Sequence, residues 1–173
     1  AFFTQFEDPK DLVDWLRAYC DADVPIPELL LEQIEAVGRP CEKRLVALLK
    51  DETAGNEAKM TAIGLLRNLE STQPKMLYIS WQLNRAAEDE LADNAIDSLI
   101  EMGPYVVQPM VEALQKANRD GQAAILDVLT RYPGHEQVYQ TALRLFREHP
   151  EGRALYAGYL ARLGDERALG ELE

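Results

Sequence analysis

The chain has very few of the residues that build metal centres, disulfide frameworks or redox sites. Its 173 residues include two cysteines, Cys20 and Cys41, and two histidines, His135 and His149. Two cysteines make neither a disulfide framework nor a zinc quartet, so we expect the reducing environment of the cytoplasm. Each cysteine is expected as a small core residue, although Cys41 stands in the first turn of an expected helix, where a lowered thiol pKa is possible. Nothing assembles a base beside either thiol. We therefore expect no catalytic residue, no cofactor and no metal.

The sequence also has little positive charge and no long apolar run. It holds 30 acidic against 18 basic residues, a net charge of −12, with a pI of about 4.6. That charge repels phosphates, so we expect no nucleic acid and no membrane surface among its partners. No apolar stretch approaches the ~20 residues that cross a bilayer, no signal-peptide pattern opens the chain, and no glycine-rich phosphate loop exists.

Strand patterns are missing as well, whereas helix-breaking residues recur at nearly regular intervals. Aligned on these breaks, three apolar columns emerge at positions that share one face of a helix. The first column is Ile34, Leu66, Leu99, Leu129 and Leu160, with steps of 32, 33, 30 and 31 residues. The second is Leu30, Ala62, Ala95, Ile125 and Tyr156, and the third is Val37, Leu69, Met102, Tyr132 and Leu163. The period predicts an all-α chain of five repeated units.

Each unit is expected to be a helical hairpin. First helices are predicted at 27–37, 56–70, 89–102, 120–132 and 151–163, and second helices at 40–50, 74–87, 104–117, 135–148 and 165–172. Glycine ends several first helices in a left-handed turn and proline begins several second helices. Pro109 is expected inside a second helix and predicts a kink there. Residues 1–25 fit no repeat, so we expect a capping helix with Asp8 as N-cap and Pro9 after it. Because the last hairpin lacks a polar outer face, we expect either that the natural chain continues beyond it or that this hairpin is not native sequence.

Two runs carry a family resemblance. Residues 153–165 resemble the consensus of the HEAT-like repeats first described in phycobilin lyases, and residues 94–111 are similar to the same consensus continued into its second helix. Pro27 and Gln122 replace the usual arginine of that consensus. The resemblance covers 26–173 as one continuous domain, with repeats at about 26–51, 55–87, 88–117, 119–148 and 150–173. It implies a right-handed α-α superhelix, with first helices on a convex face and second helices on a concave one. Its members are mostly binding scaffolds, and a minority are enzymes.

Charge sorts by helix within this register. The first helices hold 13 acidic and 5 basic residues, whereas the second helices hold 7 acidic and 9 basic residues. The acidic face is typical of solvated surface. The second helices predict a partner-binding ridge, because long cations beside a tyrosine are favoured in binding hot spots. The candidate residues are Lys43, Lys50, Lys75, Tyr78, Gln82, Arg85, Gln108, Gln115 and Arg144.

The function we expect is a non-catalytic scaffold that binds a protein or peptide, such as an acidic or amphipathic helix, along this ridge. A di-iron centre of the deoxyhypusine hydroxylase type needs several His-Glu pairs, and only His135-Glu136 provides one. A helical-repeat DNA glycosylase needs a strongly basic concave face. A phycobilin or tetrapyrrole lyase, or a related chaperone, remains an alternative that rests on the resemblance. A further alternative is a structural segment of a longer repeat protein.

Overall fold

The computed structural model describes residues 2–69 and 89–173, and within them the chain forms helices and loops without a strand. The α-helices are α1 (Pro9–Asp21), α2 (Glu28–Val37), α3 (Glu42–Lys50), α4 (Asn56–Asn68), α6 (Glu90–Met102), α7 (Val107–Leu114), α8 (Arg119–Leu129), α9 (Glu136–Glu148), α10 (Arg153–Leu163) and α11 (Leu169–Leu172). Short 3-10 helices lie at η1 (Phe3–Gln5), η2 (Arg39–Cys41), η3 (Pro104–Val106), η4 (Pro150–Gly152) and η5 (Glu166–Ala168). The expected all-α class is confirmed. The helix expected at 74–87 lies outside the described residues.

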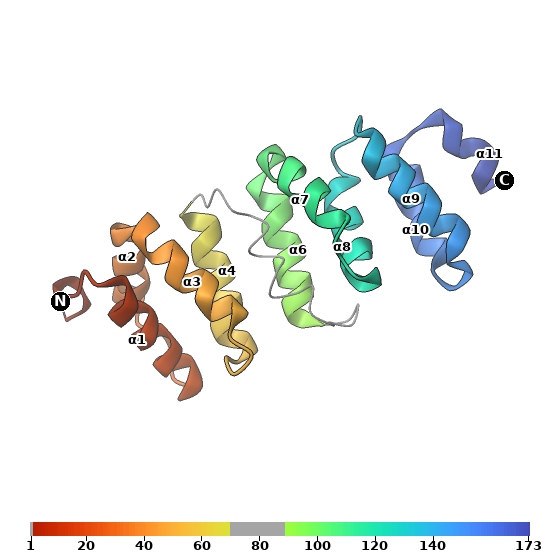
Figure 1. The fold of residues 1–173 in the computed structure, drawn as a ribbon. Coiled ribbons are helices and arrows are strands. Elements are labelled where there is room, and N and C mark those ends of the chain that lie inside the picture. Colours follow the sequence, from red (N-terminus) through yellow and green to blue (C-terminus); the bar gives the residue numbers. More distant parts are fainter. Residues whose placement is uncertain (1, 70–88) are drawn as a thin grey trace.

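The helices form an elongated row with the two termini at opposite ends (Figure 1). Helices α2, α4, α6, α8 and α10 follow one another along it, each packed against the next. A second layer lies on the near side in Figure 1, where α3 packs on α4, α7 on α8 and α9 on α10. This arrangement separates the expected first helices from the expected second helices.

The three apolar columns occupy matching depths in this row. Every member of the first two columns is at most 2% exposed. Every member of the third column is half-buried and packs against the edge of that core. Because five successive units repeat the same gradient of burial, the apolar positions predicted to face inward are confirmed.

Helix α1 begins as the sequence predicts and then takes an unexpected place. The Asp8 side chain accepts a hydrogen bond from the Lys10 backbone N–H at 2.8 Å, and Pro9 occupies the first helical position. The buried side of α1 packs against α2, α3 and α4, so the helix lies beside α3 as well as covering the end of the row. Phe3 is buried under it, whereas Phe2 is 54% exposed.

The turns differ in detail from the prediction. Gly38 and Gly103 have φ of 76° and 92°, which favours glycine, but their ψ values are extended rather than left-handed helical. Gly164 adopts the expected left-handed helical conformation. The prolines after these turns begin 3-10 helices rather than α-helices. Pro109 therefore falls in the first turn of α7, where its missing N–H costs little, and not in the helix interior where it was expected.

Candidate functional site

The ridge residues that the structure describes lie on the second layer. Lys43 and Lys50 are on α3, Gln108 is on α7, Gln115 is the C-cap of α7, and Arg144 is on α9. All five are exposed. Lys75, Tyr78, Gln82 and Arg85 lie outside the described residues.

Gln108 and Arg144 are engaged within their own helices. The Gln108 amide donates to a carboxylate oxygen of Glu112 at 3.4 Å, and the Arg144 guanidinium pairs with Glu148 at 3.0 Å. An acidic partner would have to compete with Glu148 for Arg144. Arg144 therefore offers less unmatched charge, and Gln108 fewer free hydrogen-bonding groups, than the sequence suggested.

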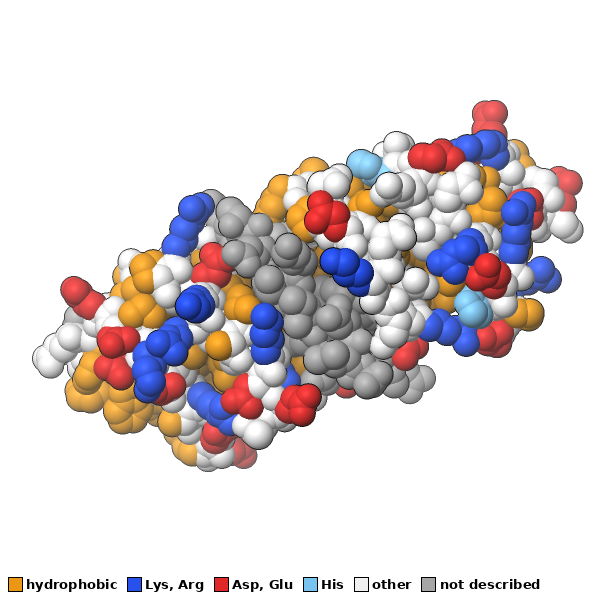
Figure 2. Space-filling model, in the orientation of Figure 1, with side chains coloured by type: hydrophobic (Ala, Val, Ile, Leu, Met, Phe, Trp, Pro, Cys, Tyr) orange, Lys and Arg blue, Asp and Glu red, His pale blue; other side chains and the backbone are white. Residues whose placement is uncertain are grey.

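Unmatched positive charge gathers instead on α3 and the turn before it. Arg39, Lys43, Arg44 and Lys50 are all exposed, and none of them forms an ion pair with another described residue. We call these four residues the α3 basic surface. Figure 2 shows Lys and Arg side chains gathered over α1 and α3. Arg39 and Arg44 were missing from the candidate residues, although their place next to Pro40 and Lys43 in the sequence was a usable signal.

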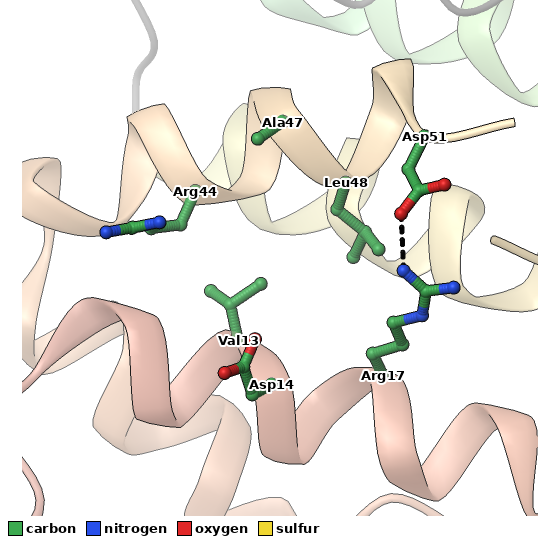
Figure 3. Close-up of a pocket in the computed structure, with 7 residues that line it drawn as sticks. All are labelled: Val13, Asp14, Arg17, Arg44, Ala47, Leu48 and Asp51. Atoms are coloured by element: carbon green, nitrogen blue, oxygen red, sulfur yellow. Dashed lines mark hydrogen bonds and ion pairs between the residues drawn. The ribbon is translucent and has the colours of Figure 1, made fainter. Parts of the chain in front are cut away.

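A small cavity of about 150 Å³ separates α3 from α1 beside this surface. Val13 of α1 and Leu48 of α3 extend into the gap, and Arg44 lies toward one end of it (Figure 3). At the other end Arg17 pairs with Asp51 at 2.5 Å (Figure 3). The cavity therefore has an apolar floor and charged ends.

The charges at the two ends of the cavity differ in how they are matched. The Asp51 carboxylate accepts hydrogen bonds from the Thr53 hydroxyl, the Thr53 N–H and Arg17, which together lower its pKa to about 2. At the Arg44 end, Asp14 is held by Lys10 at 2.6 Å, and this hydrogen bond raises the pKa of Lys10. Asp14 is thus already paired with Lys10, and Arg44 forms no ion pair with a described residue.

Arginines toward the other end of the row have a different role, since their partners lie in neighbouring repeats. Arg119 pairs with Glu151, and Arg147 pairs with Glu171. Arg162 pairs with Asp127 at 2.7 Å. Arg167 pairs with Glu136 at 2.8 Å and lies over the Tyr139 ring at 4.2 Å. Such charges hold successive hairpins together and are already satisfied.

The chemistry at the cysteines is that of buried thiols. Cys41 is fully buried and Cys20 is half-buried, and both are unpaired. Burial raises the pKa of both thiols, so the lowered pKa considered for Cys41 at its helix start is wrong. Desolvation of the thiolate outweighs the helix dipole there.

Across 2–69 and 89–173, no three His, Cys, Asp or Glu side chains are grouped so as to hold a metal ion. In the same ranges no helix has the length and apolar character to span a bilayer.

The site geometry thus consists of one exposed cationic helix face, an adjoining apolar gap and a set of satisfied ion pairs between repeats. Comparison of the chain with known protein families, with curated proteins and with solved structures found no match.

Proposed function

We propose that the chain is a HEAT-like repeat module, a right-handed superhelix with no catalytic role, which binds an acidic helical segment of a partner protein. The surface that would bind is the α3 basic surface, Arg39, Lys43, Arg44 and Lys50, as part of the concave side of the array.

The repeated burial gradient supports a repeat array. In such arrays each hairpin buries the flank of its neighbour, so the same columns become core in every unit. The two-layer row, with α2, α4, α6, α8 and α10 in succession, fits this architecture. Binding along one layer is the usual consequence of such a shape.

One observation carries the functional part of the proposal. In a chain of net charge −12, the α3 basic surface places four cations without ion-pair partners among the described residues. Several arginines elsewhere in the same protein, by contrast, are matched by carboxylates of neighbouring hairpins. Unmatched cations grouped on one rigid helix face favour an acidic partner, because complementary charge raises the association rate and sets the orientation.

The rigidity of α3 comes from its buried side. Leu45, Leu48 and Leu49 are at most 5% exposed, so the helix is anchored along its whole length. Each exposed ion pair contributes only about 0.2–1 kcal/mol, so the cations alone give modest affinity. Between Lys43 and Lys50, a strip of two apolar residues reaches the surface of α3: Val46, which is half-buried, and Ala47, which is exposed. An amphipathic partner helix would therefore rest apolar side chains on this strip while its carboxylates pair with the cations.

The unpaired cysteines agree with a reducing compartment, and we place the proposed binding function in the cytoplasm.

The test is fluorescence anisotropy with a fluorescein-labelled 18-residue amphipathic peptide made of leucine and glutamate. We expect Lys43→Glu/Lys50→Glu to weaken its binding about tenfold or more, because both attraction and orientation are lost. The control is Lys116→Glu/Arg153→Glu, which changes the net charge equally at two exposed cations elsewhere. Circular dichroism checks that all variants keep their helix content. Equal weakening by the control, or no saturable binding to the unaltered protein, would overturn the proposal.

A further inference from the structure

A second groove lies on the opposite layer, where α6, α8 and α10 meet. It encloses about 200 Å³. Its apolar lining includes Ile96 of α6, Ala123 of α8 and Leu155 of α10. Because α8 packs against both α6 and α10, the groove crosses three successive first helices.

The hollow exists because the side chains at its centre are small. Ala123 and Ala124 occupy the side of α8 that faces the groove, between the larger Ile96 and Leu155 of the flanking helices. Two residues of α10 line the groove. Tyr159 is buried, whereas Leu155 is 47% exposed. A half-exposed leucine at the edge of an apolar hollow gains by burial under a partner.

Three carboxylates surround this apolar floor. Asp93 and Asp120 lie in the first turns of α6 and α8, are exposed, and form no ion pair with any described residue. Asp127 pairs with Arg162 at 2.7 Å and, more distantly, with Arg131 at 3.8 Å. The three helices that form the groove, α6, α8 and α10, carry six acidic and three basic residues, so the charge around the groove is net negative.

We propose that this groove binds a basic amphipathic helix from a partner protein. Leucine-sized side chains of that helix would cover Ile96, Ala123 and Leu155, while lysine or arginine on its flanks would pair with Asp93 and Asp120. The complementary charge selects the sign of the partner, and the apolar floor selects an amphipathic face rather than any cationic segment.

The size of the groove sets the length of the helix. Neighbouring helices pack about 8–10 Å apart, so the three helices span roughly 20 Å, which corresponds to about 13 residues of α-helix. An 18-residue peptide covers that span with one turn to spare at its ends.

This inference is independent of the proposed binding of an acidic helix to α3. The two surfaces lie on different layers of the row and carry opposite charge. Together they would let the chain hold two partners of opposite charge at the same time.

The test uses two fluorescein-labelled 18-residue peptides of identical leucine and lysine content. One has leucine at helical spacing, and the other has the same residues reordered so that no apolar face forms. We expect the unaltered protein to bind the first peptide about tenfold more tightly, because only that peptide covers the apolar floor.

Two matched pairs of variants locate the binding. Leu155→Ser removes apolar contact, and its control, Leu169→Ser, alters a leucine of α11 that is 63% exposed. Asp93→Asn/Asp120→Asn removes two charges, and its control, Glu28→Gln/Glu32→Gln, removes two exposed charges on α2. Each groove variant should weaken binding about fivefold, and each control less than about twofold.

Other outcomes overturn the inference. Equal binding of the two peptides would show that attraction is only the net charge of −12. Equal weakening by groove variants and controls would place the peptide elsewhere. Absence of saturable binding below about 100 μM would mean that the groove binds no such helix.

Discussion

Leu99→Ala tests whether the first apolar column is the seam that joins the repeats. Leu99 is 2% exposed on α6, which packs between α4 and α8. The same column places fully buried Leu66 and Leu129 on those two flanking helices. With packed helices on both sides the cavity cannot collapse easily, so we expect a loss of about 3–4 kcal/mol in the free energy of unfolding. For a chain of this size that corresponds to a fall of about 6–16 °C in the Tm.

The matched comparison is Ile100→Ala on the same helix. It removes the same number of carbon atoms, but Ile100 is half-buried, so we expect a loss of about 1–1.5 kcal/mol. Urea titrations followed by circular dichroism at 222 nm measure both losses. Equal losses, or a cost below about 1 kcal/mol for Leu99→Ala, would refute the periodic seam.

Two further predictions follow from the turns and from pH. Gly103→Ala should destabilise the protein by about 1–2 kcal/mol, because φ at this position is 92° and favours glycine. Gly64→Ala within α4 should instead stabilise the protein by about 0.5–1 kcal/mol, since no atom of a neighbouring helix that the structure describes lies within 4 Å of the added carbon. Thermal melts that show equal effects for the two substitutions would contradict this prediction. The Asp51 pKa is lowered to about 2, so the stability that this carboxylate supplies is complete above its unfolded value of about 4 and is lost as the pH falls toward 2. The Tm of the unaltered protein should therefore fall more steeply between those pH values than that of Asp51→Asn, and parallel curves would argue against the bonds from Arg17 and Thr53.

The exposed charges of the protein fall into two groups, those that form ion pairs within the fold and those that lie unpaired on the two proposed binding surfaces. Arg162 and Asp127 join neighbouring repeats, while Lys43 and Asp93 have no ion-pair partner among the described residues. Salt weakens all exposed charge interactions. Because only the paired charges contact other parts of the fold, substitutions at paired positions should alter stability. Substitutions at unmatched positions should alter binding instead.

Local patterns in the sequence were sufficient for the helices and the core. The columns through Ile34 and Leu30 predicted buried positions in all five units, because helical periodicity depends only on residues three and four apart. The role of Asp8 as the N-cap of α1 was predictable for the same reason, since the backbone N–H that it accepts from belongs to Lys10, two residues further on. The conformation of the turns could not be predicted from the sequence, because proline is equally compatible with the start of a 3-10 helix and of an α-helix.

The pairing of charges between different helices was decided only by the tertiary structure. Arg162 and Asp127 lie 35 residues apart in the sequence, yet their side chains pair at 2.7 Å in the fold. The groove at Ala123 depends on side chains from three helices about thirty residues apart in sequence. Ion pairs and hollows form between helices, so they depend on how the hairpins pack, which the helical period alone leaves open.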